Sequence, residues 1–199
     1  MALQNRKIII IGAGHVGSHA GYALVSQGLA EEIVYIDVDV KKAEAQALDI
    51  FDSTVYLQKR AIVRAGDYSD AKDADLMIVA AGPLPDMSKG QTRMDTLRQT
   101  IAIIKDVAEN IRNSGFLGII LNISNPADVV THYLQHVLDW APERILSTST
   151  TLDSSQTAQG SGTGNRHRPE IRIRLCTRRT RRKPDGSLVH RNHCRQTVI

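Results

Sequence analysis

Short apolar runs alternate with longer segments of helical period along the first 150 residues of the chain. The apolar runs predict strands at residues 7–11, 33–36, 61–64, 76–80, 118–122 and 144–147. The intervening segments predict helices at residues 16–27, 41–52, 93–113 and 128–138, because their apolar positions recur on one helix face. Strands that alternate with helices are typical of βαβ units. The pattern therefore predicts an α/β fold with a doubly wound parallel sheet.

The composition of the 199 residues, 42% hydrophobic and 23% charged, is typical of a globular protein and excludes a disordered or fibrous one. No apolar run approaches the roughly 18 residues of a membrane helix, and the run after Lys7 breaks at glycines, unlike a signal peptide. We therefore expect a cytoplasmic protein with no membrane partner. Because Cys176 and Cys194 both lie near the C-terminus, we expect no disulfide framework and no metal site.

Charge is distributed unevenly along the chain. Residues 1–165 carry 14 Lys and Arg against 19 Asp and Glu, whereas residues 166–199 carry 11 against 2. All aromatic residues, of which Trp140 is the last, precede the basic segment. That segment therefore lacks large side chains with which to build a core, and we expect an irregular basic tail.

Three glycines follow the first predicted strand in the spacing G-x-G-x-x-G, and a predicted helix begins among them. Gly12 permits a tight turn, Gly14 lets the backbone approach a pyrophosphate, and Gly17 allows close packing of helix on strand. Asp37 ends the second strand, where a carboxylate binds the adenosine ribose and repels a 2′-phosphate. An ordinary turn with three glycines is the alternative, and Asp37 weighs against it. The motif predicts NAD as the cofactor.

Three further motifs follow later predicted strands. They are Ala80-Ala81-Gly82-Pro83 with Gln91-Thr92-Arg93-Met94-Asp95, then Ile123-Ser124-Asn125-Pro126-Ala127-Asp128, and finally residues 148–153. Together with the glycines and Asp37, this order resembles the N-terminal part of the L-lactate and malate dehydrogenase family, on the lactate or L-2-hydroxyacid branch. The resemblance covers residues 7–153. It implies an NAD-binding Rossmann domain over residues 1–150 and, for an intact member, a homo-oligomer.

The resemblance also implies roles for individual residues. The NAD site would be lined by Gly12, Gly14, Val16, Gly17, Asp37, Lys42, Tyr68, Ala81, Gly82, Ile123 and Thr148. Arg93 would be a mobile-loop arginine that moves onto the substrate carbonyl, and Asn125 would donate a hydrogen bond to the substrate oxygen. Asp153 would orient a catalytic histidine. Taken alone, Arg93 is equally a solvated charge and Asp153 a helix N-cap.

The substrate loop departs from the pattern of lactate enzymes, which typically show Q-K-P-G-E-T-R. This chain reads Met87-Ser88-Lys89-Gly90-Gln91-Thr92-Arg93. By the resemblance, Met87 faces the substrate side chain. A thioether cannot pair with the second carboxylate of malate but tolerates larger aliphatic groups. We therefore expect pyruvate or longer 2-oxo acids, and the matching L-2-hydroxy acids, as substrates.

The resemblance stops after Asp153. The family continues there with a small residue, Ala, and an Arg that binds the substrate carboxylate, whereas this chain has Ser154, Ser155 and Gln156. The family's G-E-H-G-[DE]-S, which holds the catalytic histidine, is absent from the chain. Yet one allowed set of codons for residues 178–186, read from the second nucleotide, spells G-E-H-G-E-S-Q-M.

We therefore infer a one-nucleotide frameshift between the codons for Asp153 and Gln156. Residues 151–199 would then be a remnant of the substrate domain followed by an out-of-frame tail. The catalytic domain would be truncated, and the basic tail would stand in its place. The first hypothesis is thus an NAD-dependent L-lactate-type dehydrogenase that is inactive as written, and the second is a non-catalytic NAD-binding module. The third, a nucleic-acid-binding basic tail, lacks aromatic stacking partners, and we expect no nucleic-acid partner.

Overall fold

The computed structural model describes residues 6–57, 59–92, 94–149, 151, 172–182 and 188–198. The chain divides into two compact units, Met1–Thr148 and Ser149–Ile199, each of which is described by itself. In the part of the chain that the structure describes, no helix is long and apolar enough to span a membrane.

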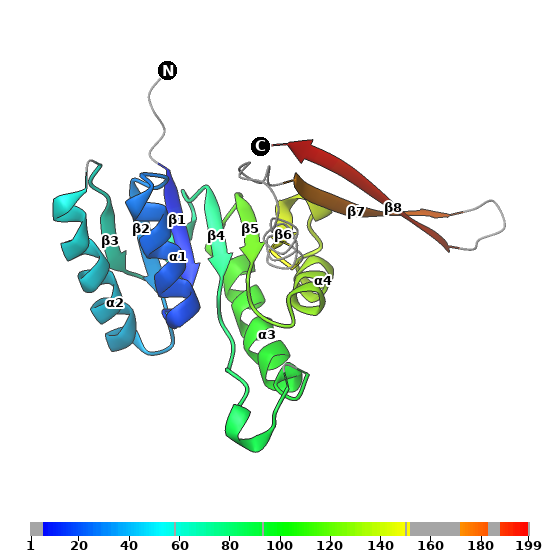
Figure 1. Ribbon diagram of the computed structural model, residues 1–199, viewed down its shortest axis with the longest axis horizontal. Coiled ribbons are helices and arrows are strands. Elements are labelled where there is room, and N and C mark those ends of the chain that lie inside the picture. Colours follow the sequence, from blue (N-terminus) through cyan, green and yellow to red (C-terminus); the bar gives the residue numbers. More distant parts are fainter. Residues whose placement is uncertain are drawn as a thin grey trace, which may run out of the picture. The chain divides into compact units, whose positions relative to one another are not determined.

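The first unit contains a six-stranded parallel sheet with the strand order β3-β2-β1-β4-β5-β6 (Figure 1). Its strands are β1 (Lys7–Ile11), β2 (Glu32–Ile36), β3 (Ile62–Ala65), β4 (Leu76–Val79), β5 (Ile119–Asn122) and β6 (Ile145–Ser147). The chain winds outward from β1 to β3, crosses to β4 and winds outward again to β6. The predicted doubly wound sheet is therefore confirmed, with each strand within one or two residues of its expected bounds.

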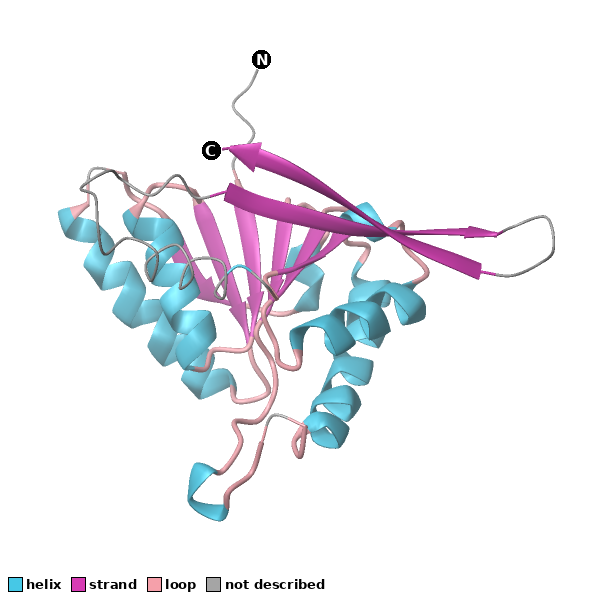
Figure 2. Cartoon of the chain, turned by 45° about the vertical axis from the view of Figure 1, so that its right-hand side comes forward, coloured by secondary structure: helices cyan, strands magenta, loops and turns pink. Residues whose placement is uncertain are grey.

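Four helices connect these strands, and Figure 2 shows them in two groups with the sheet between them. The helices are α1 (His15–Ser26), α2 (Val40–Ser53), α3 (Leu97–Ser114) and α4 (Ala127–Leu138). The described part of the unit also contains four short 3₁₀ turns: η1 (Thr54–Tyr56), η2 (Tyr68–Ala71), η3 (Met87–Lys89) and η4 (Pro142–Arg144).

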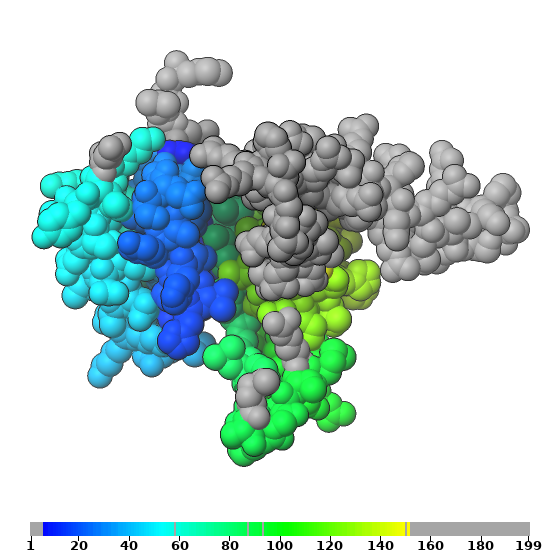
Figure 3. Space-filling view, in the orientation of Figure 1, coloured from blue at the N-terminus to red at the C-terminus, as the bar shows by residue number. Residues whose placement is uncertain are grey.

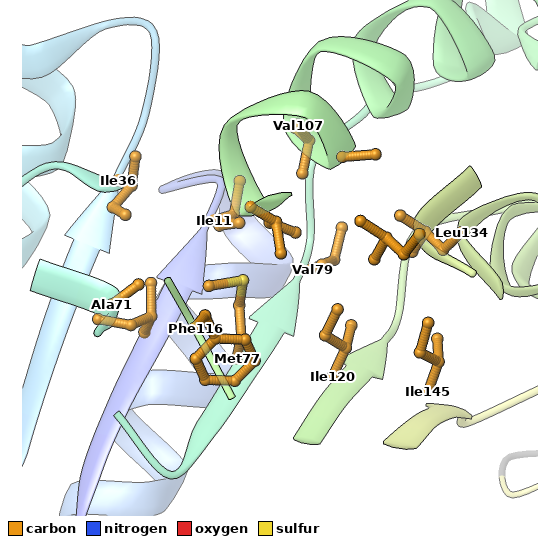
Figure 4. Packing of buried hydrophobic residues seen from close by; sticks show 14 of the residues in the cluster. Ile11, Ile36, Ala71, Met77, Val79, Val107, Phe116, Ile120, Leu134 and Ile145 are labelled. Atoms are coloured by element: carbon orange, nitrogen blue, oxygen red, sulfur yellow. The ribbon is translucent and has the colours of Figure 1, made fainter. Parts of the chain in front are cut away.

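The central strand β1 carries four consecutive buried isoleucines that alternate between the two faces of the sheet. Ile8 and Ile10 belong to the core under α1 and α2, whereas Ile9 and Ile11 belong to the core under α3 and α4. Figure 4 shows Ile11 of this second core beside Val79 and Val107. Burial on both faces is usual for parallel strands, which explains why β1 is apolar throughout rather than alternating.

The N-terminal end of β1 is tied to the segment before β4. Lys7, only 7% exposed, places its Nζ 2.7 Å from Asp73 Oδ1. Its backbone N–H donates to Asp75 Oδ2 at 3.1 Å. These contacts hold β1 in line with β4, which pairs with it from Ile8 onward.

The start of α3 differs from the sequence prediction, which begins this helix at residue 93. In the structure α3 begins at Leu97, because the preceding residues form a turn closed by Asp95. The Thr92 backbone N–H and hydroxyl both donate to Asp95 Oδ2, at 2.6 and 2.7 Å. Local side-chain hydrogen bonds of this kind compete with the helix for the same backbone groups.

The second unit contains an antiparallel pair of strands, β7 (Arg172–Arg182) and β8 (Leu188–Val198), where an irregular tail was expected. The register runs from Arg172 opposite Val198 to Arg182 opposite Leu188. Apolar and basic residues alternate at the start of β7, which is the two-residue period of a strand. The predicted remnant of the substrate domain begins at residue 151, and residues 152–171 lie outside the described residues.

Candidate functional site

The carboxyl ends of the parallel strands meet at one edge of the sheet, and the segments that leave them start side by side. Five backbone hydrogen bonds extend the ladder beyond the strands: Gly12 N to Ile36 O (2.8 Å), Gly66 N to Tyr35 O (3.0 Å), Ala80 N to Ile11 O (2.8 Å), Ile123 N to Val79 O (2.9 Å) and Thr148 N to Asn122 O (3.3 Å). Ligands of open α/β sheets bind at this edge, where the strand order reverses. Here the reversal lies between β1 and β4.

Two of the loop glycines are required by close backbone contacts. Gly12 has φ +102°, and a Cβ there would lie 2.7 Å from the Ala80 carbonyl oxygen. A Cβ on Gly17 would lie 1.9 Å from the Gly12 carbonyl oxygen. No side chain fits either position without a backbone shift. The N-terminus of α1 is therefore packed directly against the end of β1.

Gly14, the N-cap residue of α1, is different, because it borders open space. A Cβ there would meet only Lys42 Nζ, at 3.9 Å. No side chain caps the helix, and its first turn contains no acidic residue. Free N–H groups, the positive end of the helix dipole and the Lys42 ammonium group thus lie around one open position, which suits a phosphate. Val16, on the first turn, is 52% exposed.

The Asp37 carboxylate lies directly against the glycine loop. Its Oδ2 accepts a hydrogen bond of 2.7 Å from the Ala13 backbone N–H, and its Oδ1 accepts one of 3.0 Å from Asp39 N. A carboxylate offers about four lone-pair positions, so each oxygen can accept a further hydrogen bond. The carboxylate is held rigidly beside the loop and can still receive ligand hydroxyls.

The ends of β4 and β5 are joined through Ser124, which sequence reasoning did not single out. The Ser124 hydroxyl donates to Ala81 O at 2.7 Å and lies 3.2 Å from Val79 O. Gly82, the next residue after Ala81, has φ +150°. A Cβ built at Gly82 would lie 3.6 Å from Thr100 Cγ2, which is an ordinary van der Waals contact. Ala81, Gly82, Ile123 and Asn125 are therefore held on neighbouring loops, and the Asn125 side chain is exposed.

Tyr68 is placed differently from the loop residues. It lies in η2, after β3, and packs against the core under α3 and α4. Burial, together with the negative charge of Asp106, raises the pKa of Tyr68 to about 12. The phenol is therefore neutral at pH 7 and can serve as a hydrogen-bond donor.

Comparison with known protein families matches residues 6–147 to the lactate/malate dehydrogenase NAD binding domain. The chain belongs to the lactate and malate dehydrogenase family. Its residues 6–147 are the NAD-binding domain, which confirms the predicted Rossmann fold and the predicted cofactor NAD. The open cradle at Gly14 and the carboxylate of Asp37 suit the pyrophosphate and a ribose of this cofactor.

Relatives of this NAD-binding domain are named lactate dehydrogenases. L-lactate dehydrogenase 2 of Lactococcus lactis is 39% identical over 156 residues, which are 78% of this chain and 49% of the relative. A solved minor L-lactate dehydrogenase from Enterococcus mundtii has a TM-score of 0.76 at 35% identity, over 80% of this chain and 50% of that one.

A lactate dehydrogenase of Cryptosporidium parvum, solved with lactic acid and nicotinamide adenine dinucleotide, has a TM-score of 0.74 at 26% identity, over 81% of this chain and 50% of that one. The chain thus spans about half the length of the relatives it matches.

The loop between β4 and α3 of the NAD-binding domain projects beyond the strand ends (Figure 1), and the green region at the lower edge of Figure 3 protrudes from the molecule accordingly. It is organised around Asp86, whose carboxylate accepts from the Ser88 N–H and hydroxyl and pairs with Lys89 Nζ at 3.2 Å. These hydrogen bonds lower the pKa of Asp86, and the one from Ser88 contributes more than the one from Lys89. Met87 lies in η3 of this loop.

Two predicted catalytic residues, Arg93 and Asp153, lie outside the described residues. Within the described ranges, no group of three or more His, Cys, Asp and Glu side chains could hold a metal ion.

The Asn122 amide was also missed by sequence reasoning, because it ends an apolar run and precedes the recognised motif. Its side chain is completely buried and makes four hydrogen bonds. A buried amide with a full set of partners at the end of a central strand is a signal that only the structure provides.

Proposed function

We propose that this chain is the NAD-binding part of an NAD-dependent oxidoreductase of the L-lactate dehydrogenase type. The substrate pair would be a 2-oxo acid, pyruvate or a larger aliphatic one, and an L-2-hydroxy acid. The observation that carries the proposal is the Asp37 carboxylate, held 2.7 Å from a backbone N–H of the glycine loop. From there it can bind the adenosine ribose and repel a 2′-phosphate. The similarity to proteins named L-lactate dehydrogenase supports the lactate branch.

The cofactor would be held by the glycine loop with the start of α1, by Asp37, by one residue each of α2 and η2, and by residues at the ends of β4, β5 and β6. The set comprises Gly12, Gly14, Val16, Gly17, Asp37, Lys42, Tyr68, Ala81, Gly82, Ile123 and Thr148. When bound, the reduced nicotinamide supplies a hydride to C2 of the 2-oxo acid, and a proton completes the alcohol. The positive N-terminus of α1 and Lys42 would balance the pyrophosphate charge.

Three residues would act on the substrate. The Arg93 guanidinium and the Asn125 amide would donate hydrogen bonds to the carbonyl oxygen, where negative charge develops during reduction. Loop closure would expel water and bring Arg93 to this position. Met87 would contact the substrate side chain, and its flexible apolar thioether would favour aliphatic groups over a second carboxylate.

We further propose that the 199-residue chain itself does not turn over substrate. After Asp153, which would orient a catalytic histidine, Ser154, Ser155 and Gln156 stand where the family has its carboxylate-binding arginine. The proposed frameshift near these codons would explain the difference and would make residues 151–199 a remnant followed by an out-of-frame tail. A second candidate is a non-catalytic NAD-binding module, which the absence of G-E-H-G-[DE]-S and of the carboxylate-binding arginine from the sequence would favour.

Calorimetric titration of the 199-residue chain with NADH and NADPH tests the proposed cofactor role. We expect NADH to bind at least about tenfold more tightly than NADPH, because the carboxylate repels the 2′-phosphate. Asp37→Ala should weaken NADH binding about tenfold and reduce the difference between the two cofactors. The control is Asp49→Ala, which also removes an exposed carboxylate but from α2, twelve residues further along the chain. Equal NADH affinity in the Asp37 variant and its parent would remove Asp37 from the site.

A further inference from the structure

The Asn122 side chain lies at the end of β5 and connects three successive parts of the chain. Its Nδ2 lies 3.2 Å from Ser124 O and 3.0 Å from both Ala127 O and Thr131 Oγ1. Its Oδ1 accepts from the Ser124 N–H at 3.1 Å. The two amide hydrogens thus serve three acceptors, so one hydrogen is shared. The amide fixes the whole turn from β5 to the first residues of α4.

Ser124 passes this constraint on to the neighbouring strand. Asn122 holds its backbone through both the N–H and the carbonyl oxygen, which sets the direction of its side chain. The Ser124 hydroxyl then donates to Ala81 O at 2.7 Å. The backbone oxygen of Asn122 also accepts from the Thr148 N–H at 3.3 Å. The buried amide therefore links the segments that leave β4 and β5 through Ser124, and the backbone of the same residue links them to the segment that leaves β6.

From this geometry we propose that Asn122 is a positioning residue for the nicotinamide half of the cofactor site, acting through Ser124. The proposal rests on the proposed function, because it assumes that NAD binds at this edge. A doubly wound sheet has two mononucleotide-binding halves. Asp37 and the glycine loop belong to the half formed by β1, β2 and β3, whereas Asn122 and its partners belong to the half formed by β4, β5 and β6.

The two halves can be probed separately with two ligands. ADP carries the adenosine and two phosphates but neither the nicotinamide nor its ribose, whereas NADH carries all of them. In Asn122→Ala the Ser124 N–H loses its acceptor and the Ser124 carbonyl oxygen loses a donor, so the loop that carries Ile123 and Asn125 loosens. Calorimetry on the 199-residue chain should then show NADH binding weakened at least about tenfold and ADP binding changed by less than about twofold.

Two other variants separate positioning from general stability. Ser124→Ala keeps the Asn122 amide but removes the hydroxyl link to Ala81, so it should also weaken NADH selectively. Because this change is smaller, it keeps the test valid if Asn122→Ala fails to fold. Thr54→Val is the matched control. Thr54 is 2% exposed and its hydroxyl donates to Phe51 O at 2.7 Å at the far end of α2. Its loss should lower the melting temperature without changing the ratio of NADH to ADP affinity.

A parallel loss of NADH and ADP affinity in both site variants, as expected from general destabilisation, would overturn the positioning role. Unchanged NADH affinity in Ser124→Ala and Asn122→Ala would overturn it as well. If the parent chain bound neither ligand, the proposed function would fail first, and the role of Asn122 would fail with it. If the parent bound ADP and NADH and only the selective loss were missing, the proposed function would stand and the role of Asn122 would not.

Discussion

Gly14→Ala and Gly17→Ala add the same methyl group to the glycine loop, three residues apart, and we expect them to affect different properties of the protein. The Gly17 methyl would lie 1.9 Å from the Gly12 carbonyl oxygen and 3.3 Å from Ile10 Cγ2. The Gly14 methyl would meet only Lys42 Nζ, at 3.9 Å, and the backbone at Gly14 has an ordinary extended conformation. Gly17→Ala should therefore affect folding, whereas Gly14→Ala should affect ligand binding alone.

The size of each effect follows from these contacts. An overpacked methyl group typically costs about 1–3 kcal/mol, and a clash with a backbone atom lies at the upper end of that range. Replacement of a helical glycine by alanine returns about 0.5–1 kcal/mol. For a chain of this length, the net destabilisation of Gly17→Ala corresponds to a melting temperature lower by about 4–10 °C. At Gly14, the lower entropy of the unfolded chain and the poorer N-cap roughly offset each other.

Thermal unfolding followed by circular dichroism, together with calorimetric titration of NADH, measures both effects. Gly14→Ala should melt within about 2 °C of the parent, yet bind NADH at least about tenfold more weakly, because the methyl group occupies the space that the pyrophosphate needs. If Gly17→Ala were as stable as the parent, the close packing of α1 on β1 would be wrong. If Gly14→Ala bound NADH as tightly as the parent, the loop would not be the phosphate site.

Three further outcomes are expected. The pKa of Asp70 is lowered, mainly by its hydrogen bond with Arg64, so this pair stabilises the fold above the unfolded carboxyl pKa of about 4 and loses its effect as the pH falls through the lower folded pKa. Arg64→Gln removes this pair and also the contact of Arg64 with Glu32, and the loss of the Asp70 pair is worth under about 1 kcal/mol at pH 7 because the pair is partly exposed. The difference in melting temperature between this variant and the parent should therefore shrink towards pH 3, and a constant difference would contradict the assignment. The 199-residue chain should not oxidise NADH with pyruvate or branched 2-oxo acids, whereas a version with its reading frame corrected between the codons for Asp153 and Gln156 should do so; turnover by the purified 199-residue chain of verified mass would refute the frameshift. In the corrected protein, Met87→Gln should raise the ratio of kcat/KM for pyruvate to that for larger 2-oxo acids, since it restores a polar loop contact, and an unchanged ratio would show that Met87 does not face the substrate.

The fold of residues 6–147 could be predicted closely from sequence because its signals are local. The isoleucine run of β1 and the spacing of Gly12, Gly14 and Gly17 each depend on a few adjacent residues. The start of α3 could not be predicted, because the Thr92 and Asp95 side chains form a turn inside a segment whose apolar period already looks helical. The strands β7 and β8 were missed because composition outweighed the short alternation at the start of β7.

The candidate site was predictable where a residue type has one dominant use at its position. Asp37 follows a strand at the position where a ribose-binding carboxylate is expected, and the structure places it beside the loop. Asn122 was missed because its partners, among them Thr131, lie on elements that the sequence does not bring together. The functional roles of Arg93 and Asp153 remain predictions.

The four isoleucines of β1 also bear on how the strand finds its alignment during folding. A one-residue slip exchanges the two faces of a strand, and an alternating strand resists it by exposing apolar residues and burying polar ones. In β1 such a slip would replace isoleucine by isoleucine on both faces, so the residues in the middle of the strand hardly favour one register over another. The register is fixed at the ends of the strand, where Lys7 contacts Asp73 and Asp75 and where only a glycine at position 12 fits against Ala80. Substitutions at these ends, rather than in the interior of β1, should therefore give rise to misaligned sheets.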